Sequence, residues 1–160
     1  MFMRSIQSLC LIQSILMKTD LSNATFIIPI RIESDDRLRN VVTSIAFLVE
    51  NFDTNIIVKE VDKESVFQTE VLPIFEEILE VDLWKNFHHI FERSEEPLFH
   101  RQRVLNEMIA ECETDIVVNY DCDVVLPMQS YKLAYDGIME GIYDVAVSYT
   151  HLTLPTRLPV

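Results

Sequence analysis

The sequence has few glycines, few basic residues and no linker. Only 2 of its 160 residues are glycine, and no glycine- and serine-rich stretch divides the chain, so its length predicts one globular domain. The 13 lysines and arginines are outnumbered by 26 aspartates and glutamates, which gives a formal net charge of -13. This charge argues against binding to nucleic acid or, unassisted, to an anionic membrane, because phosphates attract clusters of lysine and arginine. A phosphate-containing ligand would therefore need local basic groups or a metal ion.

Cysteines are also few. The three, Cys10, Cys112 and Cys122, are odd in number and share no metal-ligand spacing. We interpret them as thiols in a reducing compartment, so the expected location is the cytoplasm, either free in it or peripheral at the inner membrane. The chain lacks the run of about 20 apolar residues that an integral membrane span requires.

The two ends of the chain, residues 1–23 and 147–160, are predicted to lie outside the domain. Residues 1–23 form an N-terminal extension whose apolar start is weighed as a targeting segment, but it is broken by Gln7 and Gln13 and lacks a small-residue cleavage site. Alternatively, translation begins at Met17 with a bacterial-style opening, and the residues before it are non-native. Residues 147–160 begin with "VSYTHLTLPT", which matches the translation of a transposon end and adaptor used in sequencing libraries. We therefore expect residues 147–160 to be non-native and the gene to be truncated there.

Between these ends, apolar runs typical of strands alternate with stretches of helical periodicity. The patterns predict strands at residues 24–32, 54–62, 86–94 and 115–120, and helices after Ser34 and at residues 71–84, 100–113 and 129–141. Strands that alternate with helices pair in parallel through right-handed crossovers. The expected fold is therefore α/β, a doubly wound, mostly parallel sheet over residues 24–146 that the truncation leaves incomplete at the C-terminus.

Charged residues stand at the end of every predicted strand. The strands end, in order, at Arg31 and Glu33, at Glu60 and Asp62, at Glu92 and Arg93, and at Asp121 and Asp123. Carboxyl ends of parallel strands share one edge of a sheet, and ligands bind at that edge, so these side chains are candidates for a common site. For any single one of them, a solvated loop charge is the alternative, since charged residues are mostly exposed.

The stretch "NYDCDVVLP" places two carboxylates one residue apart directly after an apolar run. In an extended segment Asp121 and Asp123 point to the same side, because side chains alternate with period two. Two such carboxylates repel each other, and a divalent cation such as Mn²⁺ or Mg²⁺ removes that cost while leaving positions for substrate phosphates. Cys122, between them, is expected to point away from the metal and to pack. The Asp-x-Asp pattern alone is common in unrelated chains, so its position after a strand is what favours a metal site.

Three blocks of the sequence resemble the nucleotide-sugar-binding half of GT-A glycosyltransferases, family 2-like, in the galactosyltransferase-type branch. They are an Ile-Pro-x-Arg strand in "TFIIPIRIESDDRLRNV", a Phe-x-Arg-x-x-x-Leu-Asn helix start in "FHRQRVLNEMIAECETDIVVNYDCDVVLP", and the Asp-x-Asp in the same stretch. The similarity spans residues 25–145 and keeps the order of the blocks. It implies a GT-A fold and a metal-dependent hexosyltransferase that moves a sugar from a UDP-sugar donor to a glycan acceptor, as in polysaccharide biosynthesis.

The resemblance also implies roles for residues at the ends of the first two strands. Pro29, Arg31 and Glu33 would line the nucleotide pocket. Glu60 would lie against the uracil ring. The second strand ends "KEVD" and lacks the paired aspartate common in the family, which leaves Glu60 and Asp62 as alternatives for that contact.

The resemblance implies further roles in the later part of the chain. Phe99 would pack beside the nucleotide, Arg101 would approach the diphosphate, and Asn106 would be architectural. Asp123 would bind Mn²⁺ or Mg²⁺ directly, and Asp121 would contact the ribose or the metal's water shell. The catalytic base and the acceptor site are expected beyond the truncation, so this chain by itself is expected to transfer no sugar.

Two other functions stay open. A phosphatase of the haloacid dehalogenase type also uses an Asp-x-Asp after a strand, with the first aspartate, here Asp121, as the nucleophile. In that class the motif ends the first strand of the domain, whereas here a strand, a helix and much else precede it. The other alternative is a non-catalytic fragment that binds a nucleotide sugar.

The histidines have two possible roles, as metal ligands or as structural residues. His88 and His89 are adjacent, so in a strand they face opposite sides of the sheet and cannot easily chelate one metal ion together. Structural roles are favoured for these two and for His100, because their spacing is not that of a zinc site.

Overall fold

The computed structural model describes residues 18–79 and 86–147. The predicted N-terminal extension up to Met17, the end of the helix predicted at 71–84, the segment from residue 148 onward, and Cys10 lie outside the described residues.

Strands and helices alternate along the described chain, as the sequence predicts. The strands are β1 (Thr19–Ile30), β2 (Phe52–Asp62), β3 (Phe87–Arg93) and β4 (Ile116–Asn119); the helices are α2 (Asp35–Asn51), the π-helical turn η1 (Phe67–Val71), α3 (Leu72–Ile78), α4 (Arg101–Ala110) and α5 (Met128–Met139). The four strands form one sheet in the order β3-β2-β1-β4, with every neighbouring pair parallel. The α/β class and the parallel sheet are confirmed, and the arrangement is consistent with a Rossmann-like fold. β1 begins before residue 24, the predicted start of the domain.

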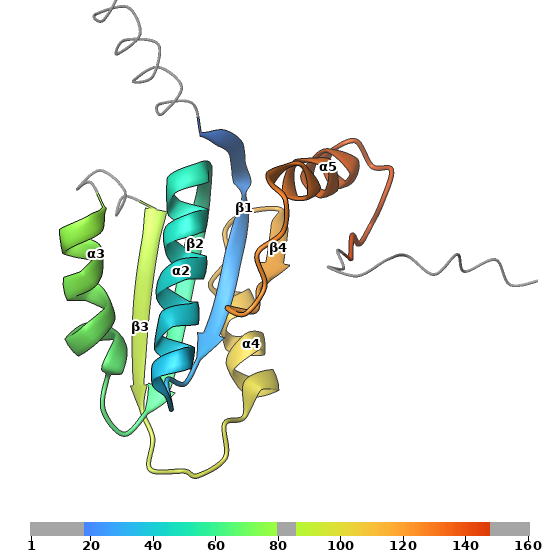
Figure 1. The fold of residues 1–160 in the computed structure, drawn as a ribbon. Coiled ribbons are helices and arrows are strands. Elements are labelled where there is room, and N and C mark those ends of the chain that lie inside the picture. The colour runs from blue at the N-terminus through green and yellow to red at the C-terminus, as the bar shows by residue number, and fades with distance from the viewer. Residues whose placement is uncertain (1–17, 80–85, 148–160) are drawn as a thin grey trace, which may run out of the picture.

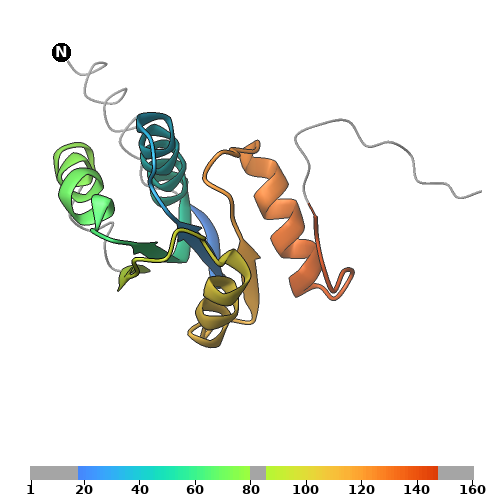
Figure 2. The same cartoon turned by 90° about the horizontal axis from the view of Figure 1, so that it is seen from below.

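The helices lie on both faces of the sheet. α2 and α3 cover one face and α4 covers the other, while α5 lies beside β4 (Figures 1 and 2). The chain runs outward from β1 through α2 to β2 and through α3 to β3, then returns through α4 to β4 on the far side of β1. The strand order therefore reverses between β1 and β4. In open α/β sheets this switch point, at the carboxyl ends of the strands, is where ligands bind.

Local sequence explains where α2 begins. The side chain of Ser34 accepts a hydrogen bond from the backbone N–H of Arg37 (3.3 Å), so Ser34 caps the helix. Asp35 and Asp36 lie in the first turn, where negative charge is favourable at the positive end of the helix dipole. The start of α2, and with it the end of β1, is therefore specified locally.

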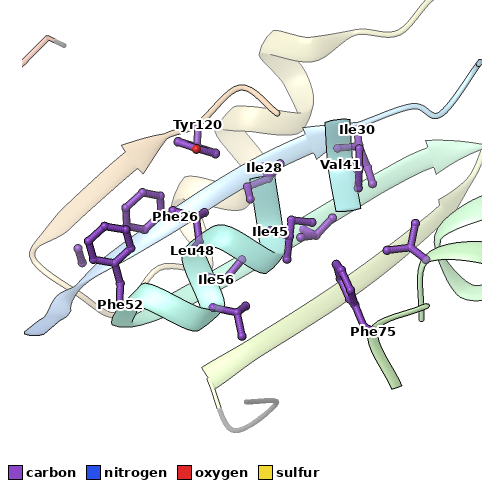
Figure 3. Close-up of a cluster of buried hydrophobic side chains, with 14 of the residues drawn as sticks. Phe26, Ile28, Ile30, Val41, Ile45, Leu48, Phe52, Ile56, Phe75 and Tyr120 are labelled. Atoms are coloured by element: carbon purple, nitrogen blue, oxygen red, sulfur yellow. The ribbon is translucent and has the colours of Figure 1, made fainter. Parts of the chain in front are cut away.

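The larger core lies between the sheet and the α2–α3 face. Its side chains come from β1, α2, β2, η1, α3 and the region around β4 and α5, and Figure 3 labels ten of them: Phe26, Ile28, Ile30, Val41, Ile45, Leu48, Phe52, Ile56, Phe75 and Tyr120. Every one of these residues is at most 5% exposed. Burial of this apolar area is the dominant favourable term for the fold, at about 25 cal/mol per Å².

A smaller core lies on the opposite face, under α4. It comprises Ile27, Ile57, Val61, Val104, Leu105 and Met108. Neighbouring residues of β1, such as Ile27 and Ile28, thus belong to different cores, as the period of two requires. No helix among residues 18–79 and 86–147 is long and apolar enough to cross a membrane.

Candidate functional site

The parallel sheet brings the charged strand ends to one edge, as the sequence predicts. In the register of the sheet Ile30 of β1 lies opposite Glu60 of β2. The backbone N–H of Tyr120, just after β4, donates to the carbonyl of Ile27 (3.1 Å), so the Asp-x-Asp segment begins beside the end of β1. The carboxyl ends of β1 and β4, which flank the switch point, are therefore adjacent.

Arg31 links the end of β1 to two other parts of this edge. Its side chain is buried, and the residue is 7% exposed. Its Nε donates to the carbonyl of Val61 (2.9 Å) and its NH1 to the carbonyl of Pro97 (3.1 Å), while the guanidinium lies 5.6 Å from the centre of the Phe99 ring. Within the described chain no carboxylate pairs with it. Arg31 is thus a buried cation held by carbonyls and an aromatic face, and it fixes the connection from β3 to α4.

Arg101, the first residue of α4, reaches the end of β4. Its NH2 group donates to Oδ1 of Asp121 (2.5 Å) and to Oδ1 of Asn119 (3.0 Å). The side chains of Arg101 and Asp121 are 41% and 61% exposed. Arg31 contacts Pro97 and Phe99 just before α4, and Arg101 is the first residue of α4, so both guanidiniums lie near the start of this helix.

The Asp-x-Asp segment forms a turn. β4 ends at Asn119, and the backbone N–H of Val124 donates to the carbonyl of Asp121 (3.3 Å). The expectation that Asp121 and Asp123 lie in one extended segment is therefore wrong, because the chain leaves the short edge strand β4 at Tyr120 and turns at Cys122 and Asp123. Asp123 is exposed and has no hydrogen-bond or ion-pair partner among the residues that the structure describes.

Cys122 is half-buried and packs against the larger core. Burial raises the pKa of its thiol to about 12, and the charge of Arg37 opposes that rise. The Ser44 hydroxyl of α2 donates to the carbonyl of Cys122. The turn is therefore anchored to α2 through Cys122, which leaves Asp121 and Asp123 on the outer side.

Glu60 is completely buried, with 0% exposure. Its carboxylate accepts hydrogen bonds from the Ser65 hydroxyl (2.5 Å) and from the backbone N–H groups of Val66 (2.9 Å) and Phe67 (3.1 Å). His89 Nε2 lies 3.4 Å from Oε2 of Glu60 and is a buried nitrogen without a hydrogen-bond partner among the described residues. Burial acts to raise the pKa of Glu60, but these contacts outweigh it and the pKa is lowered. A nucleotide base would reach this carboxylate only by displacing the start of η1.

The other predicted pocket residues lie near the same edge. Pro29 and Phe99 are half-buried, and Glu33 is exposed. Asp62, the alternative to Glu60, is also half-buried, and its Oδ1 accepts from the backbone N–H of Lys63 (2.7 Å). Of the two alternatives at the end of β2, Asp62 is therefore the more accessible carboxylate.

A network of ion pairs on the α4 face secures the helix that carries Arg101. Lys59 Nζ lies 3.1 Å from Glu92 and 2.5 Å from Glu107, and Arg103 pairs with the same two carboxylates at 2.6 and 2.8 Å. The Lys59 side chain is only 12% exposed. The network joins β2, β3 and α4, so it holds α4 in position against the sheet.

His89 and His100 each have a neighbouring side chain within contact distance. His88 is exposed, whereas His89 stacks on Phe67 with ring centres 4.3 Å apart and lies beside Glu60, so the two face opposite sides as predicted. His100 is exposed, and its Nε2 lies 3.3 Å from Glu96.

An apolar groove of about 500 Å³ runs along the outer side of β4. Its walls come from β1, β4, α5 and residues 145–147, including Phe26, Tyr131 and Ile138, and one end reaches Asn119 and Asp121. β4 pairs only with β1 within the described part of the chain. The groove is largely apolar, and the polar side chains of Asn119 and Asp121 lie only at one end of it.

The turn offers ligand atoms of the chemical type that a hard divalent cation prefers. Asp121 and Asp123 offer carboxylate oxygens, which Mg²⁺ and Mn²⁺ prefer. Among residues 18–79 and 86–147 no three His, Cys, Asp or Glu side chains converge to hold a metal ion. The turn could therefore supply two protein ligands, and water and phosphate oxygens would complete the shell, as is usual for Mg²⁺.

Two residues of this site were not predicted from the sequence. Asn119 accepts a hydrogen bond from the same NH2 group of Arg101 as Asp121 does. It stands two residues before Asp121, and side chains two residues apart in an extended segment lie on the same side, so the spacing could have indicated it. Arg37 lies in the first turn of α2, close enough for its charge to affect Cys122, and no local pattern indicated this interaction.

Comparisons with protein-family models, curated proteins and solved structures find no match to this chain.

Proposed function

We propose that this chain is the nucleotide-binding part of a glycosyltransferase of the GT-A type, which transfers a sugar from a UDP-sugar to a glycan with the help of Mn²⁺ or Mg²⁺. The observation that carries the proposal is the meeting of the Asp121–Asp123 turn and Arg101 at the switch point of a parallel sheet. The Asp121 carboxylate beside a guanidinium, with a second carboxylate two residues later, is suited to a metal-bound diphosphate, since the metal would neutralise carboxylate charge and the guanidinium would pair with phosphate oxygens.

Arg31 supports the same proposal. A buried cation without a carboxylate partner is costly, and an anionic ligand nearby offsets part of that cost. Arg31 and Arg101 thus give an acidic protein local positive charge at this edge. In the proposed reaction the metal ion would stabilise the leaving diphosphate, and Arg101 would hold a phosphate oxygen as negative charge develops there.

The phosphatase alternative is less well supported. In that class the motif ends the first strand of the domain, whereas here it comes after the edge strand β4, the last strand of the described sheet in chain order. A fragment that binds a nucleotide sugar without catalysis makes the same contacts, so it is distinguished by activity and not by binding.

Calorimetry of UDP binding in the presence and absence of Mn²⁺ tests the proposal. We expect Mn²⁺ to strengthen UDP binding by about tenfold or more, because the metal bridges carboxylate and diphosphate. Equal UDP affinity under both conditions would contradict the proposal. Release of phosphate from phosphomonoesters, lost in Asp121→Asn, would favour the phosphatase.

A further inference from the structure

Arg101 and Asp121 are paired, whereas the neighbouring Asp123 is not. The NH2 group of Arg101 contacts Oδ1 of Asp121 at 2.5 Å, and both side chains face water. An ion pair at an exposed position is weak and exchanges with other charges in solution. Arg101 therefore supplies the positive charge at Asp121 in this structure, although nothing in its described surroundings locks it there.

We propose that Arg101 is an exchangeable counter-ion of the Asp-x-Asp turn. It neutralises Asp121 until a divalent cation binds there, and the guanidinium that leaves Asp121 then binds a phosphate oxygen of the nucleotide. This inference rests on the proposed function, because it assigns a second task to the residue that would contact the diphosphate. It differs from a fixed phosphate contact, since Arg101 competes with the metal ion when no nucleotide is bound.

The competition is a consequence of charge. A guanidinium and a divalent cation on the same carboxylate repel each other, and this repulsion grows as the site is shielded from water. Asn119 contacts the same NH2 group at 3.0 Å, so the guanidinium keeps a neutral partner when it leaves Asp121. Nε and NH1 of Arg101 have no protein partner among the described residues, which leaves donors for a phosphate.

The movement is confined to one side chain. The backbone N–H of Arg101 donates to the carbonyl of Phe99 (2.9 Å), and α4 is held by the buried Val104, Leu105 and Met108. Arg101 is the first residue of this helix, so its side chain can reach either Asp121 or a ligand in front of the helix start without displacing α4.

The test compares binding of Mn²⁺ alone with binding of UDP in four versions of the whole 160-residue chain: wild type, Arg101→Gln, Arg101→Lys and Arg93→Gln. In Arg101→Gln we expect Mn²⁺ to bind about three- to tenfold more tightly, because the competing charge is gone. The same variant is expected to bind UDP about tenfold more weakly in saturating Mn²⁺, since a charge-assisted hydrogen bond is lost.

The other two variants are controls. Arg101→Lys keeps the charge at Asp121 and is expected to bind Mn²⁺ like the wild type. Arg93 is an exposed arginine at the end of β3 that pairs with Glu95 at 3.4 Å, so Arg93→Gln removes the same net charge without touching the turn. It should change either affinity by no more than about twofold. Far-UV circular dichroism and the urea midpoint establish that every variant is folded.

The outcomes separate this inference from the proposed function. Unchanged or weaker Mn²⁺ binding by folded Arg101→Gln would overturn the exchange, while a Mn²⁺-dependent UDP affinity in the wild type would keep the proposed function. If the wild type binds UDP with the same affinity with and without Mn²⁺, the proposed function is overturned. So is the claim that Arg101 moves to a phosphate oxygen once the metal has bound. Absence of Mn²⁺ binding in all four proteins would overturn the exchange, and the UDP measurement with and without Mn²⁺ would then decide the proposed function.

Discussion

Glu60 and the Asp121–Asp123 turn lie at the same edge of one sheet, yet their surroundings are opposite. The Glu60 carboxylate is completely buried and accepts three hydrogen bonds, two of them from backbone N–H groups. The Asp121 side chain is 61% exposed and contacts the end of an arginine side chain, and Asp123 is exposed without a partner among the described residues. Both are acidic ends of parallel strands, so residue type and position in the strand do not distinguish them.

The difference comes from the segment after each strand. β2 is flanked by β1 and β3, and η1 begins five residues after its end, so the N–H groups at the start of η1 find an acceptor in Glu60. β4 lies at the edge, and a turn and several further residues separate it from α5. A carboxylate that satisfies a helix start is a structural element, whereas one left in water remains available for a ligand.

The largest expected effect is on stability at Glu60. We expect Glu60→Ala to lower the free energy of unfolding by about 2–4 kcal/mol, because the N–H groups at the start of η1 and the Ser65 hydroxyl lose their acceptor. Urea denaturation measures this loss. Glu64→Ala, at an exposed position, is the matched control and should change stability by less than about 0.5 kcal/mol. A similarly small change in the free energy of unfolding for Glu60→Ala and Glu64→Ala would show that the buried Glu60 carboxylate is not a structural element.

The next effect concerns ligand binding at Asp123. In Asp123→Ala, UDP affinity in the presence of Mn²⁺ should fall about tenfold or more, to the level without metal, since a charged ligand of the cation is lost. Stability should stay within about 0.5 kcal/mol of the wild type, as at other exposed positions. Asp53→Ala, at an exposed aspartate near the start of β2 and away from the edge, controls for net charge. Loss of the fold in Asp123→Ala would show that this carboxylate is structural too.

Arg101→Ala sharpens the comparison by probing the partner of Asp121. We expect UDP to bind about 1.5–3 kcal/mol more weakly, the value of a hydrogen bond to a charged group. Uridine, which lacks the phosphates, should bind with almost unchanged affinity. Calorimetry with both ligands checks this, and an equal loss for the two would mean that Arg101 supports the structure and not the diphosphate.

The smallest effect is a pH dependence. The pKa of Glu60 in the folded protein lies below its ordinary value of 4.5, so its ionised form stabilises the fold. That contribution is fully present above about pH 5 and is lost as the pH falls through the lowered pKa. Glu60→Gln should therefore show a shallower fall in stability between neutral and acid pH, measured by urea denaturation at each pH. A slope equal to that of the wild type would contradict the role of the charge.

The fold was predictable because its signals are local. The capping Ser34 and the apolar spacing of α2 specify that helix, and the β-branched runs specify β1 and β2. The prediction was less accurate at the margins. β4 is shorter than predicted, and the segment that contains Asp121 is a turn, because an edge strand with one neighbour ends where its pairing with β1 ends.

The candidate site was predictable in part. The sequence indicated Asp121, Asp123 and Arg101, and these lie at one edge because parallel strands bring their carboxyl ends together. It did not indicate that Glu60 would be enclosed by Ser65 and the start of η1. A charged residue at the end of a strand is most often exposed, so no local pattern distinguishes the exception.

The sequence by itself determined the alternation of strands and helices, and through it the parallel sheet and the edge where the charged strand ends gather. It also determined side-chain direction within an element, as for His88 and His89, because the period of a strand is a property of the backbone. Tertiary structure decided the strand order, which acid is buried, and which cation meets which carboxylate. Those outcomes depend on contacts such as Arg31 with Val61 and Arg101 with Asp121, between residues 30 and 20 positions apart. Burial and pairing are set by such neighbours in space, so they exist only once the chain has folded.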